Sequence, residues 1–351
     1  MPPAREKLTI LIPAPRLSTV FAPIWLAEAL GYTAQEGLEV EFDIARSGSP
    51  KQAVEGVIAG HGDMTFVNIV FPLMARDRGV PLRVFYGFVR KQNRSFTVPH
   101  DSDLRTVADL RGKVIGLHFD DPELFAFAKA VLIDQGVDPQ RDVSFKPLPG
   151  SPLDATRMAA ALRSREVDAV WQLDILSGLM AAEGVPLRHL PSPTIDCLTP
   201  SSSMCALETS LEARPNVFGA FGRAVAKATV FALANPAAAI LAVWDRFPAA
   251  GPRAGEDRAR VFRGELAALR VRLEGHALEN EPNTRWGAIR ESEIVAWQNF
   301  LLRTNAIRRA RPPTDYYSDA LVPDFNRFDP GPVIAQAESF PVAKDVFQAG
   351  A

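Results

Sequence analysis

The residues of this sequence that could do chemistry are polar and aromatic side chains that follow short apolar segments. Arg16 carries a planar guanidinium that can hold a carboxylate or a sulfonate, and Ser18 and Thr19 add hydroxyl groups close behind it. Asn68 carries an amide that both donates and accepts hydrogen bonds. Asp120 would instead prefer an amine or a ring N–H. Together these groups indicate a binding site for a small molecule with acidic and hydrogen-donating character.

Each of these residues also has a purely structural explanation. Arg16 could be a loop arginine that faces solvent, and Thr19 could cap the helix that follows it. Phe66, Phe119 and Trp171 could hold a flat ligand between their rings, although aromatic side chains near strand ends are often part of a core. Position therefore supports these residues as a set more strongly than it supports any one of them.

All candidate ligand-binding residues lie where a strand gives way to a loop. The candidates are Arg16, Leu17, Ser18, Thr19, Ser47, Gly48, Phe66, Val67, Asn68, His118, Phe119, Asp120, Gly150, Ser151, Trp171, Gln172 and Asp174. For an enzyme, His118 and Asp120 are the pair that could serve as acid or base.

No metal or cofactor is expected. The five histidines show no metal-ligand spacing, and no phosphate loop, dinucleotide fingerprint or nucleophile elbow is present. Cys197 and Cys205 are too few for a disulfide framework or a four-ligand metal site. We expect them to be small buried residues, and a single bridge between them stays open.

The elements that must position the candidates are strands followed by a polar loop and a helix. Residues 8–12 form a short apolar strand, the loop 13–19 follows, and Gly31 is expected to end the next helix in the left-handed conformation. Ser49 is expected to cap another helix, with Pro50 at its first position. Loops at the carboxyl ends of parallel strands are where open α/β sheets bind ligands.

The same order of elements returns later in the chain. Asp63 and Asp168 are 105 residues apart, and each is followed three positions later by an aromatic residue. The dipeptides Ser49-Pro50 and Ser151-Pro152 are 102 residues apart and open equivalent helices. Two copies of one unit predict two similar lobes that present their strand ends to a shared cleft.

The composition predicts a soluble globular protein of two domains. The chain has 351 residues, of which 47% are hydrophobic and 23% charged. Its net charge of −2, without a basic run, argues against nucleic acid or an anionic membrane as a partner. Apolar runs are short or interrupted by charge, so no transmembrane helix is expected. The first residues also lack the pattern of an export signal.

The two lobes are expected to be joined by two strands, near residues 94–98 and 203–207. Lobe 1 would then consist of residues 1–95 and 205–351, and lobe 2, residues 96–204, would be inserted into it. Four helices are expected beyond the joint, at residues 215–234, 236–246, 257–273 and 292–305. Proline and glycine clusters from residue 311 onward predict a tail that follows a surface.

Several motifs resemble those of one known family. They are Ala22-Pro23-Ile24-Trp25-Leu26-Ala27, Leu30-Gly31-Tyr32, Glu36-Gly37-Leu38-Glu39-Val40, Ala59-Gly60-His61-Gly62-Asp63-Met64, and Val107-Ala108-Asp109-Leu110-Arg111-Gly112-Lys113 with Ile115-Gly116. Over residues 8–245 the chain resembles the NMT1/THI5-like proteins. These are type 2 periplasmic binding proteins that include alkanesulfonate, nitrate, taurine and pyrimidine-precursor receptors of ABC importers.

The resemblance implies an α/β, two-lobed Venus-flytrap fold, each lobe a mostly parallel sheet flanked by helices. It implies a monomeric periplasmic solute-binding protein that delivers a small organic molecule to the membrane subunits of an ABC transporter. The expected ligand is of the sulfonate, carboxylate or pyrimidine or other aromatic type.

The alternative is a cytoplasmic enzyme on the same fold, such as a decarboxylase, a lyase or a pyrimidine synthase acting on a small aromatic or heterocyclic acid. The missing export signal favours it. The pyrimidine synthases of the family, however, carry a histidine after the strand that corresponds to residues 64–67, and a cysteine-rich motif. Residues 68–71 contain no histidine and the chain has no cysteine cluster, so that chemistry is not expected.

Overall fold

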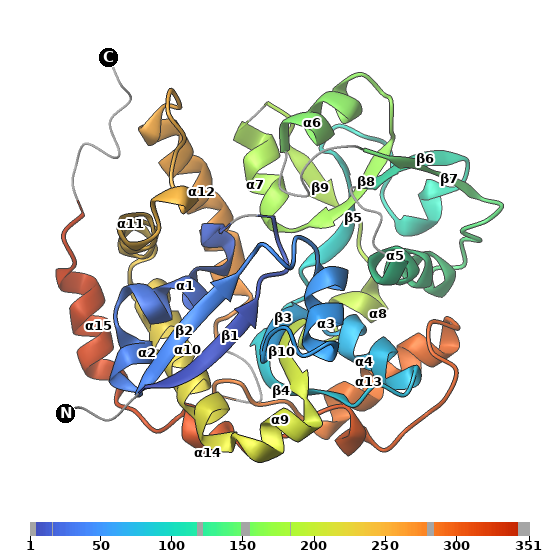
Figure 1. Cartoon of the computed structure of the whole chain (residues 1–351). Helices are drawn as coiled ribbons and strands as arrows, with labels where there is room; N and C mark the ends of the chain where they lie inside the picture. Colours follow the sequence, from blue (N-terminus) through green and yellow to red (C-terminus); the bar gives the residue numbers. More distant parts are fainter. Residues whose placement is uncertain are drawn as a thin grey trace.

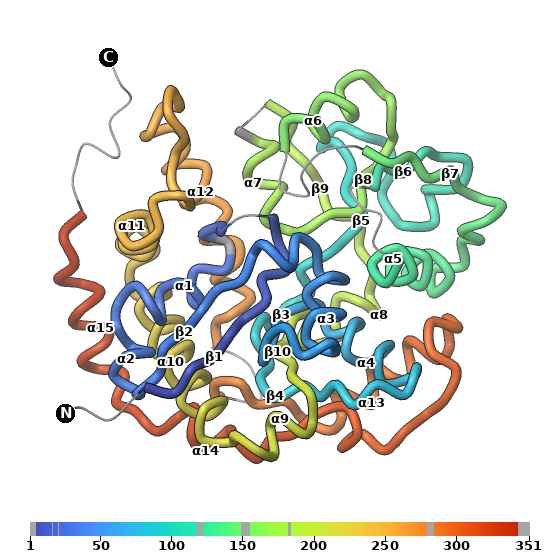
Figure 2. Tube along the Cα trace, in the orientation of Figure 1, coloured from blue at the N-terminus to red at the C-terminus, as the bar shows by residue number. Residues whose placement is uncertain are grey.

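Two five-stranded sheets, each with its own helices, form the two lobes of the protein (Figure 1). The computed structural model describes residues 5–15, 17–117, 122–148, 155–182, 184–278 and 284–342. The tube in Figure 2 shows that the chain leaves the first lobe after β4, builds the second lobe, and returns to the first with β10. The fold class is the predicted two-lobed α/β arrangement.

The first sheet has the strand order β2-β1-β3-β10-β4. Its strands are β1 (Glu6–Leu11), β2 (Leu38–Asp43), β3 (Met64–Asn68), β4 (Leu82–Val89) and β10 (Ser202–Leu207). β1 is parallel to both β2 and β3, whereas β10 is antiparallel to β3 and β4. The sheet is therefore mixed, and its one reversed strand is the strand that comes back from the second lobe.

The second sheet repeats this topology with the order β7-β6-β8-β5-β9. Its strands are β5 (Arg94–Pro99), β6 (Lys113–Leu117), β7 (Val143–Pro147), β8 (Ala169–Leu173) and β9 (Leu187–His189). β6 is parallel to β7 and β8, and β5 is antiparallel to β8 and β9. Here the reversed strand is β5, which enters from the first lobe. The limits predicted for the lobes, 1–95 with 205–351 and 96–204, stay a prediction.

Two aspartates tie equivalent strands together in the two lobes. Asp63 Oδ2 accepts a hydrogen bond from the backbone N–H of Thr9 at 2.7 Å, and Asp168 Oδ2 accepts one from Val114 at 2.8 Å. Each pair is 54 residues apart. The aspartate before β3 or β8 therefore bonds the neighbouring strand, rather than the local backbone of its own turn.

Helices cover both faces of each sheet. In the first lobe they are α1 (Ala22–Ala29), α2 (Tyr32–Gln35), α3 (Pro50–Ile58), α4 (Val70–Asp77), α9 (Glu208–Ala213), α10 (Pro215–Ala234), α11 (Pro236–Arg246), α14 (Val322–Phe325) and α15 (Pro330–Ser339). In the second they are α5 (Pro122–Asp134), α6 (Ala155–Arg163), α7 (Ile175–Ala182) and α8 (Pro193–Asp196). Short 3₁₀ turns are η1 (Thr19–Phe21), η2 (Val107–Leu110), η3 (Pro248–Ala250) and η4 (Pro313–Asp315).

Local sequence explains several helix ends. Gly31 has φ of 73° and follows α1, as predicted for a left-handed glycine. Ser49 accepts a hydrogen bond from the N–H of Gln52 and caps α3, also as predicted. Asp329 caps α15, so the expected tail contains a helix that packs on α10. By length and composition α10 could cross a membrane, but 78% of its most apolar stretch is buried inside the protein, as in a core helix.

Two C-terminal helices reach across to the second lobe. α12 (Arg258–Glu274) packs on α7, and α13 (Glu291–Arg303) packs on α5. α7 and α12 meet at Gly178, where an added Cβ would make ordinary van der Waals contact with Ala267 at 3.7 Å. The two lobes are thus held together by helices as well as by the two crossing strands.

Candidate ligand-binding cleft

A pocket lies between the two sheets, at the edge to which their parallel strands point. It encloses about 640 Å³ of empty space, part of it open to solvent, and residues of both lobes line it. The lining is Pro13, Ala14, Phe21, Pro50, Phe66, Val67, Asn68, Phe88, Asn93, Arg94, Leu173 and Ser202; we call this the cleft pocket. Only about 60 Å³ of this space has room for the centre of a water-sized molecule, so the cleft pocket is narrow in this structure.

The topology explains why these particular residues meet. β1, β3 and β8 end at the cleft pocket, whereas β5 and β10 begin there. Because β5 and β10 run against their neighbours, their first residues lie beside the last residues of those neighbours. Ser202 at the start of β10 accordingly pairs with Asn68 at the end of β3.

One wall of the cleft pocket is aromatic. The rings of Phe21 and Phe66 meet edge to face with their centroids 5.0 Å apart, and Phe66 meets Phe88 at 6.1 Å. Behind this wall the ring of Phe88 packs at 4.6 Å against His276. Burial, together with repulsion from Arg272, lowers the pKa of His276 to about 3, so this ring is neutral and extends the apolar support.

The polar lining is a contiguous group of three side chains. Asn93 Nδ2 donates to Ser202 Oγ at 2.9 Å, and Asn68 Oδ1 accepts from the N–H of Val70 at 3.1 Å, where α4 begins. Within the described part of the chain, Asn68 Nδ2 and Asn93 Oδ1 are buried and have no hydrogen-bond partner. Asn68 Nδ2 and Asn93 Oδ1 are therefore an unused donor and an unused acceptor that flank Ser202.

Charge near the cleft is compensated by neighbouring residues. Arg94 lines the cleft pocket, and its guanidinium acts electrostatically on the half-buried carboxyl of Asp174. Asp174 Oδ1 accepts from Arg272 Nη2 at 2.9 Å. Burial raises the pKa of Asp174, and the positive charges of Arg272 and Arg94 oppose that rise.

The sequence of the chain places it in a family. The NMT1/THI5-like family model matches residues 18–239, which is more than half of the chain. The chain belongs to the NMT1/THI5-like family.

A curated relative of this NMT1/THI5-like protein is the riboflavin-binding protein RibY of Chloroflexus aurantiacus. The two are 26% identical over 221 residues, which is 62% of this chain, and the match spans only about 60% of the relative's length.

Solved structures share the fold. The periplasmic aliphatic sulphonate binding protein SsuA of Escherichia coli superposes with a TM-score of 0.63 at 17% identity, covering 88% of this chain and 96% of that one. The desulfurization enzyme DSZB superposes with a TM-score of 0.58 at 16% identity, covering 92% and 99%. The fold of this NMT1/THI5-like protein is thus shared by binding proteins and by an enzyme.

Of the predicted site residues, Phe66, Val67 and Asn68 line the cleft pocket. Ser18 and Thr19 are buried and do not line it, and the Ser18 carbonyl accepts from the indole N–H of Trp25 at 2.6 Å. Leu17 is half-buried and packs on the hydrophobic core of the first lobe.

The proposal that Thr19 caps the following helix is wrong. The 3₁₀ turn η1 separates Thr19 from α1, whose N-cap is Phe21 with no side-chain cap. Thr19 therefore lies too early in the chain for its hydroxyl to reach the first N–H groups of α1.

Other predicted residues make hydrogen bonds within the protein and do not line the cleft pocket. Ser47 Oγ donates to the Asp43 carbonyl at 2.8 Å, and the N–H of Gly48 donates to Gln52 Oε1 at 3.0 Å. Gln172 Nε2 donates to Ser177 Oγ at 3.3 Å. The remaining candidates, Arg16, His118, Phe119, Asp120, Gly150 and Ser151, lie outside the described residues.

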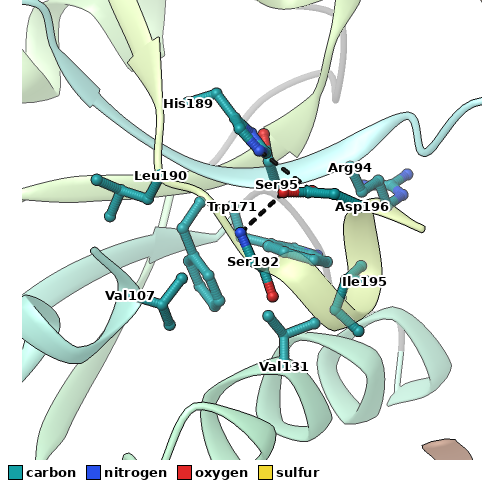
Figure 3. Close-up of a pocket in the computed structure, with 11 residues that line it drawn as sticks. Arg94, Ser95, Val107, Val131, Trp171, His189, Leu190, Ser192, Ile195 and Asp196 are labelled. Carbon is teal, nitrogen blue, oxygen red and sulfur yellow. Dashed lines mark hydrogen bonds and ion pairs between the residues drawn. The ribbon is translucent and has the colours of Figure 1, made fainter. Parts of the chain in front are cut away.

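Trp171 belongs to the interior of the second lobe. Figure 3 shows it in a small cavity with Val107, Val131 and Ile195, next to the contacts of Asp196 with His189 and Ser192. Its ring lies 4.6 Å from Phe96 and is 1% exposed. The structure does not bring it to the cleft pocket, because its ring packs on Phe96 and Phe127 inside the second lobe.

Sequence reasoning missed Asn93, Arg94 and Ser202. Each lies at the beginning of a crossing strand, whereas the predicted site residues follow the ends of strands. The signal was present, because a strand that enters a sheet in the reverse direction brings its first residues to the ligand-binding edge. Cys197, expected to be buried, is exposed, and both cysteines are free.

Proposed function

We propose that this protein is a solute-binding protein that captures a small organic molecule in the cleft pocket and delivers it to an ABC importer. The observation that carries the proposal is the lining itself: Phe66 and Asn68 come from the first lobe, and Arg94 and Leu173 from the second. A molecule held by both lobes favours the closed state, because contacts from both sides exist together only there.

The names of the relatives support this role. RibY is named for binding riboflavin and SsuA for binding aliphatic sulphonates. A periplasmic location and the membrane subunits of a transporter as partners follow from the same proposal. The ligand would be of the sulfonate, carboxylate, pyrimidine or other aromatic type.

The test is equilibrium binding of a panel of sulfonates, aromatic carboxylates, pyrimidines and flavins to the full chain. Calorimetry should give one site per chain, small-angle scattering should show a smaller radius of gyration with the ligand, and chromatography should recover the ligand unchanged. Recovery of a product would show an enzyme instead. Absence of binding across the panel would contradict the proposal.

A matched pair of variants locates the site. Leu173 and Leu187 are both half-buried leucines that pack on the same core of the second lobe, but only Leu173 lines the cleft pocket. Leu173→Ala should weaken binding of the panel ligand by about tenfold, while Leu187→Ala leaves it unchanged. Equal effects of the two variants would place the ligand elsewhere.

A further inference from the structure

From Asn68, Ser202 and Asn93 we infer that the cleft recognises a flat ring with a cyclic amide edge, that is, a ring carbonyl next to a ring N–H. Asn68 Nδ2 would donate to the carbonyl, and Asn93 Oδ1 would accept from the N–H. This inference rests on the proposed function and specifies which ligand chemistry fits the same site.

The orientation of Asn68 is fixed by its own contacts. Its Oδ1 accepts from the N–H of Val70 at 3.1 Å, so the amide nitrogen is the atom that has no hydrogen-bond partner among the described residues. The side chain is 7% exposed and lines the cleft pocket. A buried amide nitrogen without a partner is costly, which is why such a group in a binding site indicates a ligand acceptor.

Asn93 supplies the hydrogen-bond acceptor, Oδ1. Its Nδ2 donates to Ser202 Oγ at 2.9 Å, which turns Oδ1 away from the serine, and the residue is 3% exposed. Oδ1 has no partner among the described residues. Because Ser202 pairs with Asn68 across β3 and β10, Asn68 and Asn93 flank the same serine. A donor and an acceptor that flank one serine match the acceptor and donor of a cyclic amide.

The remaining lining suits the body of such a ring. Phe21, Phe66 and Phe88 supply aromatic faces and edges, and the opposite lobe supplies the aliphatic Leu173. An aromatic ring gains from edge and face contacts of this kind beyond the burial of its area. The combination favours a flat, mostly apolar molecule whose polarity is confined to one edge.

The charges favour a neutral edge over an anion. The acceptor Asn93 Oδ1 would face a sulfonate or carboxylate oxygen lone pair to lone pair. Arg94, the cation of the lining, is electrostatically paired with Asp174, whose carboxyl is also held by Arg272. An anion would therefore gain less from Arg94 than from an uncompensated guanidinium.

The experiment compares three probes of similar size on the full chain: quinolin-2(1H)-one, its 1-methyl derivative, and naphthalene-2-sulfonate. Ligand-observed NMR titration measures dissociation constants down to weak binding. We expect quinolin-2(1H)-one to bind, and methylation of its N–H to weaken binding at least about tenfold, because Asn93 Oδ1 is then left buried and unpaired. Equal affinity of the methylated probe, or tighter binding of the sulfonate than of quinolin-2(1H)-one, would overturn the inference while leaving the proposed function standing. No binding of any probe or panel compound would overturn both.

A variant tests the proposed hydrogen bond from Asn68 Nδ2 to the ring carbonyl. Asn68→Asp keeps the oxygen that accepts from the N–H of Val70 at the start of α4 and replaces the donor nitrogen by an acceptor, so affinity for quinolin-2(1H)-one should fall at least about tenfold. Asn235→Asp is the matched control, since Asn235 Oδ1 also accepts from an N–H at the start of a helix, that of Ala238 in α11, while its Nδ2 donates to the Ala337 carbonyl and the residue does not line the cleft pocket. The control should lose stability but no affinity. Unchanged affinity in a folded Asn68→Asp variant would also overturn the inference.

Discussion

Phe88 shows how a single ring can serve both binding and packing. It lines the cleft pocket, touches Phe66 on one side, and rests on the neutral ring of His276 on the other. A ligand that stacks in the cleft therefore meets a ring whose position is already fixed. Because this ring is held in place before binding, less side-chain entropy is lost when the ligand binds.

We expect Phe88→Leu to weaken binding of an aromatic ligand about threefold to tenfold, because edge-to-face ring contacts contribute about 0.5–1.5 kcal/mol beyond burial. Phe218→Leu is the control. Phe218 is also buried and also meets another ring, Phe85, at 5.3 Å, but it does not line the cleft pocket. Both variants should lower the midpoint of urea unfolding, and only Phe88→Leu should change the affinity measured by calorimetry.

For Trp171 we expect a substitution to lower stability but not ligand affinity. Its ring packs against Phe96 at 4.6 Å and Phe127 at 5.3 Å inside the second lobe. Trp171→Ala should lower the free energy of unfolding by about 3–5 kcal/mol, and Trp171→Phe by less, while the affinity of the folded fraction stays the same. If affinity were lost while stability stayed the same, Trp171 would be a ligand-binding residue.

At the scale of elements, α10 is joined to the strand–helix unit of the first lobe by a network around Glu36. Lys227 donates to Glu36 Oε1 at 2.7 Å, and Arg223 Nε donates to Oε2 at 3.0 Å. Burial by itself would raise the pKa of Glu36, but these hydrogen bonds and charges hold it below its ordinary value of 4.5. The network thus links the end of α2 to the long core helix.

The network makes part of the stability depend on pH. A carboxyl whose pKa is lower in the folded than in the unfolded state stabilises the protein above the unfolded value, near 4.5, and loses that contribution as the pH falls through the folded value. Glu36→Gln should therefore cost about 2 kcal/mol at pH 7 and clearly less at pH 3, measured by urea unfolding. Glu39→Gln, at a 60% exposed residue paired with Lys7, should change stability by less than about 0.5 kcal/mol at either pH. An equal cost of Glu36→Gln at both pH values would contradict this account.

Elements were predictable from the sequence where a local rule decided them. Pro215 and Pro236 open α10 and α11 at the expected residues, because proline is preorganised for the first helical turn. Asp63 and Asp168 revealed the duplication, although not the strand that each bonds. The polar lining was only partly predicted. Asn68 follows the end of a strand, whereas Asn93 and Ser202 lie at the beginning of the crossing strands, whose reversed direction brings them to Asn68.

At the scale of the whole molecule, α12 and α13 decide how firmly the lobes are joined. Ion pairs of Arg272 with Asp174 and of Arg303 with Asp134 connect them to the second lobe. In the first pair the Arg272 side chain is 0% exposed and Asp174 is 25% exposed, whereas in the second Arg303 is 54% exposed and Asp134 is 4% exposed. The two pairs have the same chemistry but differ in their access to water.

This difference predicts unequal costs when the acids are neutralised. Asp174→Asn leaves a buried guanidinium without its counter-charge and should lower the free energy of unfolding by about 3–5 kcal/mol, whereas Asp134→Asn should cost about 1 kcal/mol, because Arg303 can be hydrated. Adding Arg272→Met to Asp174→Asn should restore part of the loss, since the enclosed charge is then gone. Because α12 bears on α7, the Asp174→Asn variant should also show a larger radius of gyration by small-angle scattering in the absence of ligand. If the double variant is no more stable than Asp174→Asn alone, the pair is not coupled, and the lobes are held by the apolar contact of α12 with α7.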